Sequence, residues 1–172
     1  AGLSRDRIAA DTWRILNRLG PDAGERPLHL PLIFARAALN ALVFDLAAFS
    51  GMEMENMTRG HGWAFLDIGR RIERGVSLAR RVEAALRCTA AREFLLEPLL
   101  EMADSVITYR RRYFAEPRLA GVLDLLLLDS ANPRALAFQL SVLERHAEGL
   151  PAGPNPEGAP SVQQQFARLR GK

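Results

Sequence analysis

Charged residues interrupt an otherwise apolar line along a predicted helix that begins within residues 59–74. Residues three and four apart stack on one helix face, so Gly69, Arg70 and Glu73 share that line and Arg74 follows directly. A carboxylate among guanidinium groups stays ionised when partly buried, because the partner charges offset desolvation. The group could be a general base or an anchor for an anionic or amide substrate. The alternative is an inter-helix ion pair that fixes register, with Gly69 letting a neighbouring helix approach closely; this is the default.

A tryptophan and a histidine precede this line and are candidate substrate contacts. Trp63 begins the line, and His61 lies between two glycines just before it. The alternative for His61 is a helix-entry residue that hydrogen-bonds the backbone. The other histidines, His29 and His146, form no His-x-x-x-His or Glu-x-x-His pair with it. The spacing therefore predicts no metal site, and no cofactor is expected.

A run of three arginines supplies a further candidate. We expect a helix from Leu99 to Phe114 that opens on Pro98 as its first-turn residue. On that helix Arg110 falls on the core side, which makes it the expected partner for Glu73 if the two helices pack together. A phosphate or carboxylate clamp is a second interpretation, because guanidinium forks suit those groups. The third interpretation is that the three arginines form a solvent-exposed basic edge, with only Arg110 pointing inward.

Composition and missing motifs exclude several classes of protein. The chain has 172 residues, a net charge of +3 and a single lysine, Lys172, among 23 basic residues. This arginine bias, without a contiguous patch or a known module, argues against nucleic-acid binding. No phosphate-binding glycine loop or Gly-x-Ser-x-Gly motif is present, which disfavours a self-contained nucleotide-binding enzyme. The lone Cys88 and the lack of a leader or a long uninterrupted apolar run predict a cytoplasmic protein without a membrane span.

Helical periodicity predicts an all-α bundle of six or seven helices. The first helix is capped by Ser4, the second runs from Leu32 to Phe49 and ends at Ser50-Gly51, and the third runs from Thr58 to Cys88. The second is apolar nearly all round and is expected to be central, and Asn132-Pro133 is expected to open a helix that continues to His146. We expect a helical domain over 1–150, and a Pro/Gly-rich loop with a short terminal helix over 151–172. The predicted core face of the third helix is the apolar stripe Phe65, Ile68, Ile72, Val76, Ala79, Val82 and Leu86.

Four sequence blocks in order resemble the bacterial alpha-E domain, a family expected to be all-helical with a Glu-Arg signature. The blocks are Asp11–Arg18, Gly62–Arg74, Thr108–Tyr113 and Leu123–Arg134, and Glu73-Arg74 matches the signature. The resemblance implies that these two residues are signature positions of the family, and it assigns them no function. It also implies that the complete family domain is roughly twice as long. This chain would then be the C-terminal portion, and the N-terminal half would carry a Glu-Arg signature of its own.

The resemblance implies partners more than a reaction. Alpha-E proteins are typically encoded beside, or fused to, an ATP-grasp ligase and a transglutaminase-like protein. The implied role is that of an accessory or partner module in amide or peptide ligation. The alternative is an enzyme of amide or peptide chemistry that uses Glu73 with Arg70, Arg74 or Arg110.

Overall fold

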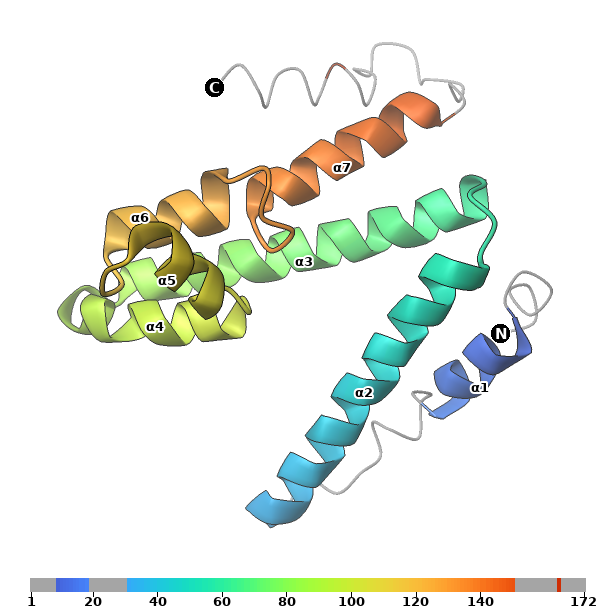
Figure 1. The fold of residues 1–172 in the computed structure, drawn as a ribbon, viewed down its shortest axis with the longest axis horizontal. Coiled ribbons are helices and arrows are strands. Elements are labelled where there is room, and N and C mark those ends of the chain that lie inside the picture. Colours follow the sequence, from blue (N-terminus) through green and yellow to red (C-terminus); the bar gives the residue numbers. More distant parts are fainter. Residues whose placement is uncertain (1–8, 19–30, 151–163, 165–172) are drawn as a thin grey trace. The chain divides into compact units, whose positions relative to one another are not determined.

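Helices make up the regular structure of the protein in a computed structural model, which describes residues 9–18, 31–150 and 164 (Figure 1). The all-α prediction is confirmed, with seven α-helices within the described residues. Ser4 and the predicted terminal segment lie outside them, apart from Gln164. The helices are α1 (Ala10–Arg18), α2 (Leu32–Asn56), α3 (His61–Arg87), α4 (Arg92–Met102), α5 (Val106–Tyr113), α6 (Leu119–Leu123) and α7 (Leu136–Gly149), with a 3₁₀ turn, η3 (Thr89–Ala91), and a π-helical turn, η4 (Asp124–Leu128).

The chain divides into two compact units, Ala1–Trp63 and Ala64–Lys172. In the first unit α1 packs against α2 and buries Thr12 and Ile15. The guanidinium of Arg18 donates to the carboxylate of Asp45 at 2.8 Å, which ties the end of α1 to the middle of α2. Among the described residues of this unit, apolar contact and the Arg18–Asp45 ion pair therefore hold α1 against α2.

Helix α2 departs from its prediction in length and in burial. It continues through Ser50-Gly51 to Asn56, because one glycine costs a helix only about 1 kcal/mol and good helix formers follow it. The central position expected of it is also wrong, since apolar side chains along its length are exposed, Phe34, Val43 and Phe44 among them.

Helix α2 also has the length and apolar composition of a helix that could cross a membrane. It has 25 residues and contains an 18-residue window of mean hydropathy 1.8. The expectation that no segment reaches the required length and hydropathy is therefore wrong. Core helices of soluble proteins and signal sequences pass the same test, so length and composition alone assign α2 to no environment.

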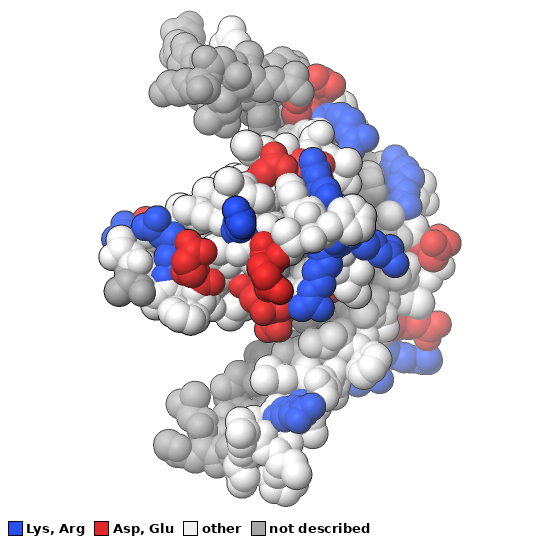
Figure 2. All heavy atoms as spheres, turned by 60° about the vertical axis from the view of Figure 1, so that its left-hand side comes forward, with Lys and Arg blue, Asp and Glu red and all other residues white. Residues whose placement is uncertain are grey.

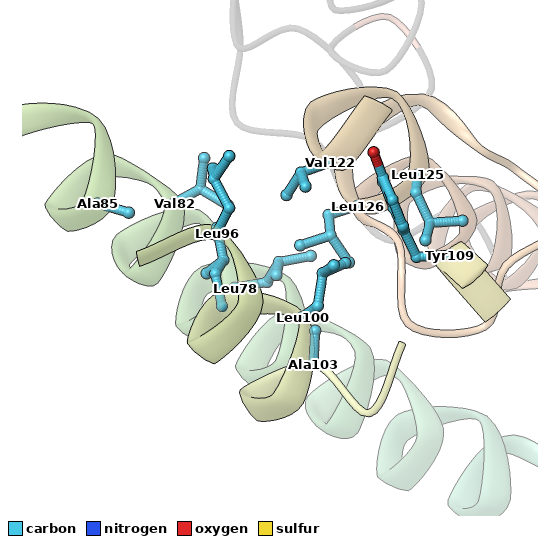
Figure 3. Close-up of a cluster of buried hydrophobic side chains, with 11 residues drawn as sticks. Leu78, Val82, Ala85, Leu96, Leu100, Ala103, Tyr109, Val122, Leu125 and Leu126 are labelled. Carbon is cyan, nitrogen blue, oxygen red and sulfur yellow. The ribbon is translucent and has the colours of Figure 1, made fainter. Parts of the chain in front are cut away.

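The core of the second unit lies around the C-terminal end of α3, where α4, α5 and α6 gather (Figure 1). Figure 3 shows its side chains converging from α3, α4, α6 and η4. Leu100, Val122, Leu125 and Leu126 are almost completely buried there. Tyr109 closes the cluster; its hydroxyl accepts a hydrogen bond from the backbone N–H of Arg118 at 3.0 Å. Apolar burial at this end is the main source of stability for the unit.

The predicted helix from Leu99 to Phe114 is two helices, and the break between them matters for the site. Pro98 lies inside α4 instead of opening a helix. The chain turns at Asp104, whose φ of 50° is left-handed, and the buried Ser105 precedes α5. Because α5 starts in a new direction, faces extrapolated across residue 104 do not hold.

Helix α7 starts later than the sequence predicts, at Leu136. Asn132 does not cap it. The Oδ1 atom of Asn132 accepts from the backbone N–H of Arg134 at 3.0 Å, and its Nδ2 donates to the carbonyl of Leu125 at 3.1 Å. This is the local turn that asparagine forms readily. It holds the loop before α7 against η4, and α7 then runs back alongside the N-terminal half of α3 (Figure 1).

Candidate functional site

Helix α3 has two unlike sides. One side is buried in the second unit and carries Asp67, Gly75, Leu78, Val82 and Ala85. The other side exposes 61% of Phe65, 50% of Ile72 and 45% of Val76. The predicted core stripe is therefore wrong over the first half of the helix, and only Val82 and Leu86 at its end join the core. Periodicity finds an apolar stripe but does not say whether the same chain covers it.

The glycine that allows close packing is Gly75, not Gly69. A Cβ atom at Gly75 would lie 3.3 Å from Cδ1 of Leu136 in α7. A Cβ atom at Gly69 would have no neighbour within 4 Å among the residues the structure describes. The expected helix approach at Gly69 is thus wrong, and α7 approaches α3 at Gly75, further along the helix.

Glu73 lies on the open side of α3 and is exposed. It borders an open hollow of about 470 Å³. Within the described part of the chain, Glu73 makes no hydrogen bond or ion pair with an arginine, so it is not held as a buried base. The described residues around the hollow all come from α3 and are Gly69, Ile72, Glu73, Val76, Ser77, Arg80 and Arg81.

Arg110 does not meet Glu73. It is exposed on α5, and its Nη2 donates to Oε1 of Glu97 in α4 at 2.7 Å. The prediction that Arg110 faces the core is wrong, because the turn at Asp104 rotates α5 so that Tyr109 is the buried residue. Two of the sequence-predicted partners therefore lie on different surfaces.

The buried carboxylate of α3 is Asp67, which the sequence analysis did not single out. Its two oxygens accept hydrogen bonds from Arg71, at 2.9 Å from Nη2 and 3.3 Å from Nε. Nε2 of His146, in the last turn of α7, lies 2.8 Å from Oδ2. Arg71 also donates to Oε1 of the buried Gln139 at 3.4 Å, and Nε2 of Gln139 donates to the carbonyl of Pro133 at 2.6 Å. This polar network joins α7 to α3.

The electrostatics of Asp67 follow from these partners. Burial acts to raise its pKa, but the hydrogen bonds from His146 and Arg71, together with electrostatic attraction to these two side chains, outweigh burial and hold the pKa below its ordinary value. Asp67 is therefore ionised at neutral pH. Because an ionised carboxylate only accepts hydrogen bonds, the Nε2 atom of His146 carries the proton it shares with Asp67.

The sequence reveals only one local pair of this network, Asp67 with Arg71. Asp67 and Arg71 are four residues apart on one helix, the spacing at which opposite charges meet. His146 is 79 residues from Asp67 along the chain. Nothing in its neighbourhood marks it, and only the antiparallel packing of α7 on α3 brings it to the carboxylate.

Arg70 and Arg74 flank this network and are half-buried. Nη1 of Arg70 lies 4.0 Å from Oδ1 of Asp67. Burial lowers the pKa of both guanidinium groups, and repulsion by other arginines adds to this: Arg74 and Arg71 act on Arg70, while Arg71 and Arg134 act on Arg74. The Arg74 of the Glu-Arg pair therefore belongs to the packed side of α3, whereas its Glu73 belongs to the open side.

The remaining candidates lie at the start of α3, in the first unit. His61 is exposed at the first residue of the helix. The guanidinium of Arg59 stacks over the ring of Trp63 at 4.4 Å from its centroid, and it donates to the carbonyl of Met54 at 2.6 Å. Both contacts lie within the first unit. Among the described residues, no group of three or more His, Cys, Asp or Glu could hold a metal ion.

Comparison with known proteins gives the chain a family. It matches the Alpha-E family, described as a predicted alpha-helical domain with a conserved ER motif, over residues 1–172. Uncharacterised proteins of Mycobacterium bovis and Mycobacterium tuberculosis are 34% identical to it over 156 residues, which is 86% of this chain but 18% of each relative. The chain thus spans about a fifth of their length. No solved structure matches. The chain belongs to the Alpha-E family.

Proposed function

We propose that this chain is an accessory helical module that binds the ligase of an ATP-grasp amide- or peptide-ligase system. The observation that carries the proposal is the open side of α3, where Phe65, Ile72 and Val76 form an exposed apolar stripe beside a hollow. In a globular protein the apolar stripe of an amphipathic helix is normally covered. Exposed contiguous apolar surface marks an interaction site.

The shape and charge of this side suit a protein partner. Gly69 leaves room for a side chain of the partner, and the apolar stripe offers contacts at helical spacing, as in helix-in-groove recognition. Glu73, Arg80 and Arg81 place charges of both signs around the hollow. Basic and acidic side chains also intermingle over the face shown in Figure 2, so no broad surface of one sign covers that face.

The choice of partner rests on the family. Alpha-E proteins resembling this chain are typically encoded beside, or fused to, an ATP-grasp ligase and a transglutaminase-like protein. The matched relatives are much longer than the matched segment, which supports a domain that works beside further protein. The N-terminal half of the family domain and the transglutaminase-like protein are further partners on the same reasoning. The proposal places the chain in the cytoplasm.

The test is a binding titration of this chain with the purified ATP-grasp ligase encoded beside it. Ile72→Glu puts a charge on the open side and should weaken binding by at least tenfold, because a buried unpaired charge is costly in an interface. Ile107→Glu is the matched control, since Ile107 is an exposed isoleucine on α5. Equal affinity of both variants and the wild type would remove the proposed surface. Self-association of the chain through this side, or binding to lipid vesicles without binding to the ligase, would replace the proposal.

One observation favours the alternative function, an enzyme that uses Glu73. Glu73 borders the hollow together with Arg80 and Arg81, where a substrate would meet both a carboxylate and guanidinium groups. This version predicts that Glu73→Gln abolishes product formation in the reconstituted ligase system while the affinity for the ligase is unchanged. Full product formation by Glu73→Gln would exclude it.

A further inference from the structure

The strongest unexplained feature on the packed side of α3 is a half-buried arginine without a partner. Arg74 makes no hydrogen bond or ion pair with any residue in the described part of the chain, although a guanidinium group carries five N–H donors. Its neighbours differ in this respect: Arg71 is bound by Asp67, and Arg134 donates to Oδ2 of Asp104 at 2.7 Å. A partly desolvated charge without a partner destabilises the fold.

Positive charge gathers around Arg74 from two elements. Arg70 and Arg71 precede it on α3, and Arg134 comes from the loop before α7. Leu136 packs at the position of Gly75, and this contact brings the loop against α3 beside Arg74. The charges of opposite sign that act on Arg74 are Asp67, already shared by Arg71 and His146, and the exposed Glu73. Neither gives the Arg74 guanidinium a hydrogen bond.

We propose that Arg74, with Arg70 and Arg134 beside it, binds the oxyanion of a small ligand, either a phosphoryl or a carboxylate group. Planar guanidinium groups bind both kinds of oxyanion through paired N–H donors. A bound oxyanion would give Arg74 its missing acceptors and relieve the repulsion among the arginines. The proposed site uses none of the residues that form the proposed ligase-binding surface, so it does not depend on that proposal.

The experiment titrates the full chain separately with inorganic phosphate and with succinate, at constant ionic strength set with sodium chloride, and follows the melting temperature and binding by calorimetry. We expect one or both anions to bind, and Arg74→Gln to weaken that binding about tenfold, the loss of a charged hydrogen bond. Arg87→Gln, an exposed arginine in the last turn of the same helix, should bind as the wild type does. Phosphate binding alone identifies a phosphoryl ligand, and succinate binding alone identifies a carboxylate.

A second readout separates this role from a purely structural one. Without anion, Arg74→Gln should be at least as stable as the wild type, because it removes a charge that Arg71 and Arg134 repel. Arg74→Lys keeps the charge but loses the fork, so its affinity should fall between those of Arg74→Gln and the wild type. No binding of either anion beyond the chloride control would overturn the proposal. Equal affinity of Arg74→Gln and Arg87→Gln, or a loss of stability in Arg74→Gln without anion, would also overturn it.

Discussion

The two sides of α3 differ in whether the rest of the described chain covers them. On the packed side a buried carboxylate, Asp67, is bound by Arg71 and His146, and apolar residues such as Leu78 and Val82 follow it into the core. On the open side Ile72 and Val76 remain exposed, with Glu73 beside them. The carboxylate and the apolar residues of the packed side thus find their partners within the described chain, whereas the open side has apolar surface that nothing described covers. The Glu73-Arg74 pair is therefore divided between the two sides, with Glu73 on the open side and Arg74 on the packed side.

The largest effect is expected from removing the buried carboxylate. Asp67→Ala leaves Arg71 and His146 without their anion in a half-buried setting, and should lower the free energy of unfolding by about 3–5 kcal/mol. Glu73→Ala, six residues further along on the open side, should change it by no more than about 0.5 kcal/mol. Urea denaturation of both variants measures the contrast. Similar losses in the two variants would show that the sides do not differ in this way.

Apolar truncations give the next largest contrast. Leu78→Ala removes a side chain buried in the core cluster and should cost about 2–4 kcal/mol, through lost burial and the remaining cavity. Ile72→Ala on the open side should cost less than about 1 kcal/mol, because half of its side chain is already in water. Thermal and urea unfolding of the pair checks this. A larger loss in Ile72→Ala would mean that the described chain already covers the open side.

The pKa of Asp67 predicts a dependence of stability on pH in the acid range. Because this pKa is lower in the folded protein than its ordinary value of 3.8, the unfolded chain binds the proton more readily. The stabilisation is therefore fully present above about pH 4 and is lost as the pH falls through the folded-state pKa. Urea unfolding between pH 5 and pH 2 should show this decline in the wild type and a flatter one in Asp67→Asn. Parallel declines would remove the assignment to Asp67.

The smallest contrast compares the two glycines of α3. Gly69→Ala adds helix propensity in open space and should stabilise the protein by about 0.5–1 kcal/mol. Gly75→Ala gains the same propensity but presses its new methyl group against Leu136, so its net effect should be smaller than that of Gly69→Ala. Differential scanning calorimetry resolves the difference. A greater gain at Gly75 would show that α7 does not approach α3 there.

Sequence periodicity predicted the fold class and most of α3, but it misjudged which side of α3 is packed. The apolar stripe through Phe65, Ile72 and Val76 is as regular as a core face, and only the position of α7 decides that the side with Asp67 is buried. The turn at Asp104 was equally hidden, since its left-handed backbone has no glycine to signal it. Arg110 was misplaced for that reason alone.

For the candidate site, local spacing could reveal Asp67 with Arg71 but not His146. The sequence identified Glu73, Arg70 and Arg74 as unusual on an apolar helix, and the structure separates Glu73 from the two arginines. Such a separation depends on how α7 lies across α3, which is a tertiary contact between residues far apart in the chain. Patterns within one helix do not contain that information.

The measurement that most directly tests the contrast between the two sides is site-specific photo-crosslinking to the purified ATP-grasp ligase. A photoreactive amino acid at position 72 reports on the open side, and one at position 107 serves as the exposed control on α5. We predict a crosslink to the ligase from position 72 and none from position 107. A crosslink from position 107 alone, or from neither position while the two proteins remain bound, would contradict the proposal that the open side of α3 is the binding surface.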